Sequence, residues 1–244
     1  MEGFILAAGL GTRLRPLTND RPKALVEING VTLLERTIRR LEAANVKHIV
    51  VNVHHFADKV IDFIKSHTWQ AAIDISDERE LLLDTGGGLK KAAALFSGRE
   101  NVLVHNVDIL SNLDLGWLRE QHRPDALATL LVSDRKTQRY LLFREDGRLA
   151  GWTNLATGEV RSPYPDLDPS ACRMLAFSGI HYMSCGIFQA FEALEMPERF
   201  PIMDFYLKAC DRYPIYAAVP SNLHLLDVGK LDTLAQAERF CRDI

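Results

Sequence analysis

The stretch that decides the fold is FILAAGLGTRLRPLTNDRPK, residues 4–23. It opens with an apolar run, residues 4–8, of the length and character expected of a buried strand. Gly9 and Gly11 then flank a single residue, so the backbone can turn sharply and approach a ligand without a Cβ in the way. The N–H groups of such a turn can converge on an anion. The stretch therefore predicts a strand that ends in a ligand-binding turn.

Two cations accompany this turn. Arg13 carries a planar charged fork suited to phosphate oxygens, and Lys23 adds a point charge directly after Pro22. The arrangement is not a Walker loop, because no Gly-Lys-Ser/Thr follows, and Arg13-Leu14 stands where a dinucleotide fingerprint needs its third glycine. A lone Gly-x-Gly is more often just a tight turn, but together with two cations it predicts phosphate handling.

The composition is that of an ordinary globular protein. The 244 residues are 47% hydrophobic and 25% charged, with a formal net charge of −3. No broad basic field is present, so we expect no nucleic-acid partner. Anionic substrates would be held by local cations and not by the overall charge.

Cysteine usage and the absence of leader patterns favour a reducing compartment. The four cysteines are scattered without a Cys-x-x-Cys pair, which is typical of free thiols. The chain reads straight into a strand without a signal-peptide pattern, and its longest uncharged run, residues 174–191, is too polar to span a membrane. We therefore expect a cytoplasmic protein with no membrane partner.

Apolar strand patterns alternate with helical ones along the chain. Further strands are expected at residues 47–53, 73–75, 101–108, 126–132, 140–143, 148–152, 175–182, 215–218 and 224–228. Helices are expected at residues 32–44, 56–66, 89–96, 113–122, 187–194, 202–210 and 231–241, with Thr32 and Glu35 forming a capping box on the first. This alternation predicts one α/β domain over residues 1–244, with ligands at the carboxyl ends of parallel strands.

A second glycine motif is LLLDTGGGL, residues 81–89. Three glycines at the start of the helix expected at residues 89–96 would place free N–H groups beside a ligand. The alternative is a flexible loop, which such a motif alone indicates about as often.

Two aspartates end predicted core strands. Asp108 closes NVLVHNVD, residues 101–108, and Asp227 lies in LDVG, residues 226–229. Two carboxylates without a neighbouring His or Cys suit Mg²⁺ better than zinc.

The first stretch resembles the signature GxGTRLxPLTxxxPK of the sugar-1-phosphate nucleotidyltransferases. The matching residues are Gly9, Gly11, Thr12, Arg13, Leu14, Pro16, Leu17, Thr18, Pro22 and Lys23. The resemblance implies a Rossmann-like, three-layer α/β fold of the GT-A type with a mainly parallel mixed sheet. It also implies that a nucleoside triphosphate and a sugar 1-phosphate react to give a nucleotide sugar and pyrophosphate.

The resemblance further implies roles for particular residues. Catalysis is expected to involve Arg13, Lys23 and Asp108, with Mg²⁺ bound by Asp108 and Asp227. The expected nucleotide-binding residues are Ala8, Gly9, Gly11, Thr12, Arg13, Lys23, Thr85, Gly86 and Gly87. The expected sugar-binding residues are Asn154, Ser178 and Gly179.

The chain departs from the family pattern in two places. Val107 replaces a usual glycine before Asp108, and no lysine occurs between residues 145 and 203, where many relatives have a Glu-Lys-Pro motif. The sequence therefore does not identify the residue that binds the sugar phosphate. Arg161 and Arg173 are candidates for an extra sugar carboxylate or are merely exposed, and His181 is more typical of a core histidine than of a ligand.

The triple glycine, the Asp-Val-Gly ending and the short chain resemble the features of the family's uridylyl-transferring members. This resemblance implies UTP and N-acetylmuramate 1-phosphate as substrates. The alternatives are guanylyl transfer to mannose 1-phosphate or heptose 1-phosphate and, in a different class, a non-catalytic sugar-nucleotide-binding regulatory relative. A homo-oligomer is possible.

Overall fold

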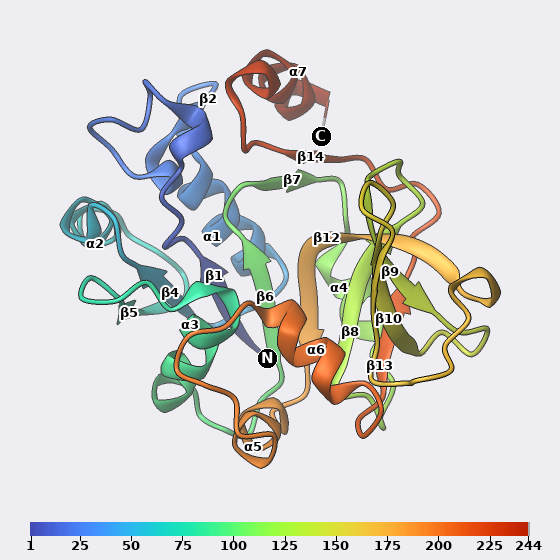
Figure 1. Cartoon of the computed structure of the whole chain (residues 1–244). Coiled ribbons are helices and arrows are strands. Elements are labelled where there is room, and N and C mark those ends of the chain that lie inside the picture. The colour runs from blue at the N-terminus through green and yellow to red at the C-terminus, as the bar shows by residue number, and fades with distance from the viewer. Residues whose placement is uncertain (244) are drawn as a thin grey trace.

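The computed structural model describes residues 1–243 and shows one large sheet with helices on both faces (Figure 1). The strands of that sheet are β1 (Glu2–Leu6), β4 (His48–Val53), β5 (Ala72–Asp77), β6 (Val102–Asn106), β8 (Ala128–Ser133), β9 (Arg139–Phe143), β10 (Leu149–Asn154), β11 (Glu159–Arg161), β12 (Arg173–Met183) and β13 (Ile215–Ala218). Their order is β11-β10-β9-β12-β6-β1-β4-β5, and β8 pairs with β12 and β13.

The N-terminal half of the sheet is parallel. The first apolar run of the chain forms β1, which lies between β4 and β6 with Leu6 beside both Asn52 and Asn106. Side chains alternate between the two faces, so Phe4 and Ile5 are both fully buried but enter different core clusters. Because β1, β4 and β6 are parallel, their carboxyl ends lie at the same edge of the sheet.

The C-terminal half is built around β12, the longest strand of the sheet. It runs antiparallel to β6, β8 and β9, and the β9–β10 hairpin carries β11 as its outer strand. The α/β class and the mixed sheet expected from the sequence are confirmed.

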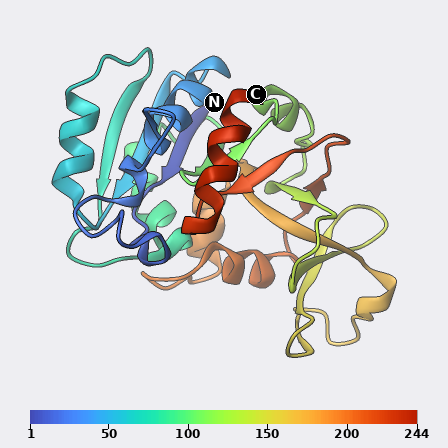
Figure 2. The same cartoon turned by 90° about the horizontal axis from the view of Figure 1, so that it is seen from above.

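Helices cover both faces and complete three layers. They are α1 (Leu33–Ala43), α2 (Ala57–Lys65), α3 (Asp84–Ala92), α4 (Leu115–Glu120), α5 (Ile187–Ala193), α6 (Ile202–Ala209) and α7 (Leu234–Asp243). Core residues of α1, α2 and α4 pack in one cluster, and those of α3, α5 and α6 pack in the other. Figure 2 shows α1 on the opposite side of the sheet from α5 and α6. None of these helices, within residues 1–243, is both long and apolar enough to cross a bilayer.

The N-cap predicted for the first helix is confirmed, but the reciprocal bond of a capping box is not seen, because the Glu35 carboxylate accepts from Arg39 at 2.8 Å. The Thr32 hydroxyl accepts a hydrogen bond from the Glu35 N–H at 3.1 Å, and α1 begins at Leu33. Before it, β2 (Glu27–Ile28) and β3 (Val31–Thr32) form a small hairpin. Its turn residues, Asn29 and Gly30, both have positive φ, as the Asn-Gly pair predicts.

Two expectations about elements are wrong. The helix expected from residue 89 begins earlier, because α3 starts at Asp84 and contains all three glycines. The late strand expected at residues 224–228 is not in the core sheet, because β14 (Leu225–Asp227) pairs only with β7 (Ile109–Ser111) in a separate ribbon. This ribbon crosses one end of the molecule beneath α7 (Figure 1).

Candidate active site

A cavity of about 270 Å³ lies at the carboxyl ends of β1, β4 and β6. Its lining comes from the first glycine turn, from Lys23, from the start of α3 and from the segment after β6: Leu6, Ala7, Ala8, Gly9, Lys23, Asn52, Leu82, Asp84, Thr85, Asn106, Val107 and Asp108. Of the predicted nucleotide-binding residues, Ala8, Gly9, Lys23 and Thr85 are in this lining. The parallel strand ends thus bring together segments that are far apart in sequence.

The first glycine turn has a backbone that requires glycine at one position. Gly11 has φ +64°, and a Cβ there would lie 3.0 Å from the Lys23 Cβ. Its carbonyl accepts a hydrogen bond from the buried Thr18 hydroxyl at 2.8 Å. Thr12 and Arg13 follow in a single 3-10 turn, exposed beside the cavity. The turn therefore lies against Lys23, and a larger residue at position 11 would disturb both.

The predicted charged groups converge next to the cavity. Lys23 forms a largely buried ion pair with Asp108. Burial first, and the Asp108 carboxylate second, raise the pKa of Asp227. The positive charges of Lys23 and Arg13 are near enough to lower the pKa of Asp227, which partly offsets this rise. Arg13 and Asp227 both lie against Gly229. A Cβ on Gly229 would be 2.8 Å from the Arg13 guanidinium and 2.7 Å from Asp227 Oδ1.

The short ribbon explains how Asp227 arrives here. Asp227 pairs in register with Ile109, and the N–H of Val228 donates to the Asp108 carbonyl at 2.9 Å. The sequence correctly predicts that the two carboxylates are neighbours, but not the way in which they meet. Asp227 is held by β7, the strand that directly follows Asp108, and not by the end of a core strand.

Two carboxylates that repel each other in a partly buried position are a suitable donor set for a hard divalent cation. Mg²⁺ prefers oxygen ligands and typically takes one or two carboxylates, with phosphate oxygens and waters completing its shell. Among residues 1–243 no group of three or more His, Cys, Asp or Glu side chains gathers as a metal site. Asp108 and Asp227 are thus the residues that fit such an ion.

The second glycine motif has a different role from the one expected. The N–H groups of Gly86 and Gly87 both donate to the Phe200 carbonyl, at 2.9 and 3.0 Å, so they are not free to meet a ligand. A Cβ on Gly86 would lie 2.3 Å from the Phe200 ring, and one on Gly87 would lie 2.3 Å from the Glu198 carbonyl. The glycines allow α3 to pack against the 198–200 segment. The expectation that their N–H groups face the nucleotide is wrong.

Residues at the very start of α3 do reach the cavity. Asp84 lies in the left-handed region at φ +64°, and its carboxylate accepts from the Thr85 N–H at 2.7 Å. The Thr85 hydroxyl in turn accepts from the Ile202 N–H at 2.9 Å. A non-glycine residue in this conformation at the edge of a cavity is a feature that functional sites often retain.

Sequence reasoning missed Asn52, which joins the walls of the cavity. Its side-chain oxygen accepts from the N–H groups of Ala7 and Ala8 at 2.7 and 3.2 Å, and its amide donates to Glu78 at 2.8 Å. The other Glu78 oxygen accepts from the Leu83 N–H at 3.1 Å. The only signal in the sequence is one polar residue near the end of the apolar run HIVVNV.

Glu78 is the acidic residue of this region that the structure buries. It is 1% exposed, and burial raises its pKa even though the hydrogen bond from Asn52 opposes the shift. Glu78 therefore serves as an acceptor for the loop before α3.

The predicted sugar-binding residues lie on two strands of the sheet, Asn154 on β10 and Ser178 and Gly179 on β12. Gly179 has φ +73° and lies against the cavity residue Asn106, since a Cβ there would be 2.9 Å from its side-chain nitrogen. Ser178 is 1% exposed, and its hydroxyl has no partner within the described residues. Asn154 lies at the end of β10, where its side chain accepts from the Ala156 N–H at 3.1 Å, as in an ordinary turn.

The two candidate arginines lie apart from this cavity. Arg161 is paired with Asp204 at 2.7 Å, and Arg173 begins β12 beside Phe143. Neither is in the cavity lining. His181 is buried and bonded to the Tyr206 hydroxyl, as expected of a core histidine.

Residues 3–161 match the MobA-like NTP transferase domain, and because this is more than half of the chain, the chain belongs to that family. Its curated relatives support the resemblance to sugar-1-phosphate nucleotidyltransferases. The chain is 53% identical over 108 residues to an N-acetylmuramate alpha-1-phosphate uridylyltransferase of Caulobacter vibrioides, covering 43% of this chain and 44% of the relative. It is 31% identical over 137 residues to a mannose-1-phosphate guanyltransferase of Yarrowia lipolytica, covering 55% and 38%.

The match thus spans less than half the length of each of these relatives. Among solved structures, HddC from Yersinia pseudotuberculosis complexed with GMP-PN superposes with a TM-score of 0.74. That likeness covers 98% of both chains at 24% identity, and it bears on the fold alone.

Proposed function

We propose that the chain transfers a nucleotidyl group from a nucleoside triphosphate to a sugar 1-phosphate in a Mg²⁺-dependent reaction. The observation that carries this proposal is the convergence of Lys23, Asp108, Asp227 and Arg13 beside one cavity at the strand ends. Two cations and a carboxylate pair are what a transfer between phosphate groups requires.

The reaction needs no general base. The second pKa of a phosphate monoester is about 6, so the sugar phosphate is already a dianion near neutral pH. One of its oxygens bonds to the α-phosphorus of the triphosphate, while the bond between that phosphorus and the bridging oxygen of the β-phosphate breaks. Pyrophosphate leaves with the electron pair, and catalysis consists of alignment and charge neutralisation.

Each charged residue has a role in this scheme. Arg13, which is exposed beside the carboxylates, would hold the departing pyrophosphate. Lys23 would bind oxygens of the reacting phosphates. To do so, its ammonium group must replace part of its contact with the Asp108 carboxylate by a contact with phosphate. Asp108 and Asp227 would hold Mg²⁺, which when bound neutralises charge on phosphate oxygens.

The start of α3 is the part of the cavity best placed to meet the base. Asp84 and Thr85 line the cavity and follow the loop that Glu78 holds. Base choice rests on a few hydrogen bonds, and a wrong base leaves buried polar groups unpaired.

UTP and N-acetylmuramate 1-phosphate are the proposed substrates. The 53% identity to the Caulobacter uridylyltransferase supports this choice. The similarity to a mannose-1-phosphate guanyltransferase makes GTP with mannose 1-phosphate the second candidate.

A panel of four nucleoside triphosphates crossed with several sugar 1-phosphates, read out as pyrophosphate, tests the proposal. We expect the highest kcat/KM with UTP and N-acetylmuramate 1-phosphate. A clear preference for GTP with mannose 1-phosphate would overturn the substrate choice but not the reaction. Binding of nucleotide sugar without pyrophosphate release from any pair would indicate a non-catalytic relative.

A further inference from the structure

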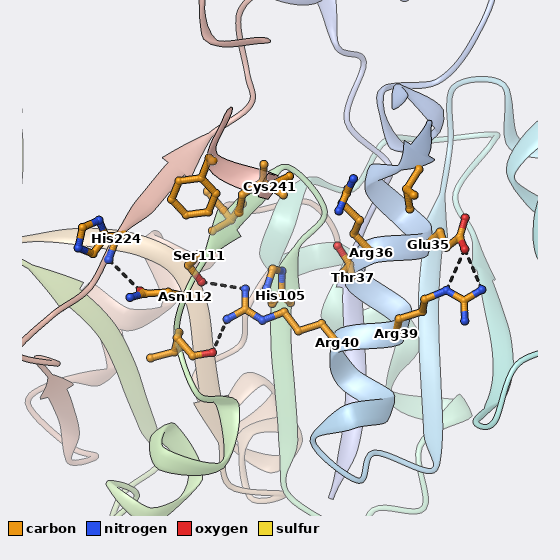
Figure 3. A pocket seen from close by; sticks show the side chains of 15 residues that line it. Glu35, Arg36, Thr37, Arg39, Arg40, His105, Ser111, Asn112, His224 and Cys241 are labelled. Carbon is orange, nitrogen blue, oxygen red and sulfur yellow. Dashed lines mark hydrogen bonds and ion pairs between the residues drawn. The ribbon is translucent and has the colours of Figure 1, made fainter. Parts of the chain in front are cut away.

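A second and larger cavity, of about 950 Å³, lies beside α1, the β7–β14 ribbon and α7 (Figure 3). It shares no lining residue with the cavity at the strand ends. The side chains that matter for its chemistry are Arg36 and Arg40 from α1, His105 from β6 and Ser111 from β7. Nothing in the proposed reaction uses them.

The two arginines bring positive charge, and among residues 1–242, whose side chains the structure describes, no carboxylate forms an ion pair with either of them. Arg40 donates to the Ser111 hydroxyl at 2.9 Å and to the Leu113 carbonyl. Arg36 donates to the Ile28 carbonyl, and its Nε is buried with no partner among the described residues. Arg39, which also lines the cavity from the same helix, is by contrast paired with Glu35 at 2.8 Å (Figure 3).

The charge of Arg40 is also poorly solvated. Burial lowers its pKa to about 10, and the charge of Asp114 only partly offsets that effect. Residues four apart on a helix share one face, so Arg36 and Arg40 present their charge to the same cavity. The position therefore favours a bound anion.

His105 supplies a hydrogen-bond acceptor on the same wall. The residue is 1% exposed, and its Nδ1 faces the Asn106 carbonyl at 2.8 Å, so Nδ1 carries the proton. Burial first, and Arg40 second, lower its pKa to about 3, which keeps the ring neutral. Its Nε2 is then an acceptor, and within the described part of the chain this buried atom has no partner.

We propose that this cavity is a second ligand site, and that its ligand is a phosphate monoester carrying hydroxyl groups. A phosphate dianion matches two guanidinium groups in charge and in fork geometry, whereas a single carboxylate would leave one of them uncompensated. A ligand hydroxyl satisfies His105 Nε2, which a bare anion would leave unpaired. The proposal goes beyond the proposed reaction and does not depend on it.

Calorimetric titration of the whole protein with glycerol 3-phosphate, without Mg²⁺ or substrates, tests this site. We expect saturable binding that Arg36→Gln weakens at least about tenfold, the loss of one charge-assisted hydrogen bond. Arg99→Gln, the same change at an exposed arginine outside the cavity, should leave binding unchanged. Arg13→Ala should also leave it unchanged, because Arg13 belongs to the other site.

Methyl phosphate, which lacks a hydroxyl on its ester group, provides the second comparison. It should bind more weakly than glycerol 3-phosphate by roughly 2–10-fold, and His105→Phe should abolish this difference. An absence of binding to the wild type, equal affinity in Arg36→Gln, or loss of binding in Arg13→Ala would each overturn the proposal. Circular dichroism of each variant verifies that it folds.

Discussion

Asn52 is a single side chain that fixes the walls of the cavity at the strand ends without a role in the proposed reaction. Its amide joins the turn after β1 to Glu78, and Glu78 joins it to the loop before α3. Both segments line the cavity at the strand ends. The position of these two cavity-lining segments therefore depends on this chain of hydrogen bonds, which lies in the interior, where hydrogen bonds are electrostatically strongest.

Replacing Asn52 with Leu should damage both stability and turnover. The change leaves the N–H groups of Ala7 and Ala8 buried without an acceptor, at a cost of roughly 2–4 kcal/mol in unfolding free energy. We expect a raised KM for the nucleotide together with a lowered kcat, because the first turn is no longer fixed. Urea unfolding and steady-state kinetics measure the two effects.

The matched control is Ser76→Ala on the adjacent strand β5. Ser76 is also buried, but its hydroxyl has no partner within the described residues, so its removal should change little. If Asn52→Leu behaved like Ser76→Ala, the loops would not depend on Asn52.

At this scale the sequence reveals charged residues better than neutral ones. Asp108 and Asp227 stand out because each follows an apolar run, and Arg13 and Lys23 stand out because they belong to the signature after the first strand. Asn52 does not stand out, because one asparagine in an apolar run also fits a strand end, and its partners lie in other segments.

Helix α3 is the element in which local sequence and tertiary packing conflict. Glycine disfavours a helix interior by roughly 1 kcal/mol relative to alanine, so three in a row predict a loop or a helix start. Close packing of α3 against the 198–200 segment requires them nonetheless, because a Cβ at Gly86 or Gly87 would meet Phe200 or Glu198. Local propensity is overridden by a contact that no local pattern reveals.

Gly86→Ala should therefore destabilise the protein although it improves helix propensity. The added Cβ overlaps the Phe200 ring, and such overpacking typically costs about 1–3 kcal/mol. Gly186→Ala is the control, since the nearest atom there is 3.4 Å away and φ is −64°. Thermal unfolding of the two variants should separate them, and an equal or higher stability of Gly86→Ala would contradict the packing role.

The β7–β14 ribbon is the other element that the sequence does not predict correctly. A short apolar run before Asp227 predicts a core strand, but its partner is the three-residue strand after Asp108. Pairing between residues so far apart in the chain leaves no periodic signal. The local patterns of β1, β4 and α1, by contrast, predict those elements well.

Strand β4 begins with an ion-paired histidine that should make stability depend on pH. His48 lies between Glu2 and Asp74, at 2.8 and 3.0 Å. Burial alone would lower the pKa of His48, but its two carboxylate partners outweigh this and raise the pKa. A raised folded pKa contributes stability that is fully present below the unfolded value, about 6.5, and is lost as pH rises through the folded value.

His48→Gln should consequently cost more stability at about pH 6 than at about pH 8.5. Urea unfolding at both pH values measures the difference. His67→Gln is the control, because within the described residues the hydrogen bonds of that ring go to Ser66 and the Phe63 carbonyl and not to a carboxylate. A His48→Gln effect that grew with pH would mean that the neutral ring is the stabilising form.

On the scale of the whole molecule, one sheet links two apolar clusters. Neighbouring residues of β1 enter different clusters, so neither cluster can be separated from that strand. We propose that the chain folds as one domain. Near- and far-ultraviolet circular dichroism should then report one coincident thermal transition, and two resolved transitions would contradict this.

The parallel half of the sheet brings the glycine turn and Asp108 to the same edge, and the ribbon adds Asp227. The whole fold thus serves to place two carboxylates and two cations around one cavity. This arrangement, and not any single motif, is the basis of the proposed reaction.

Pyrophosphate release from UTP and N-acetylmuramate 1-phosphate, measured with Mg²⁺ for the wild type, Asp108→Asn and Asp227→Asn, tests this account most directly. Each substitution keeps the side-chain shape and removes one ligand charge, so we expect kcat to fall at least ~100-fold in either variant while the circular dichroism spectrum stays that of the wild type. Near-normal kcat in either variant, with Mg²⁺ as the only divalent metal, would contradict the assignment of the carboxylate pair.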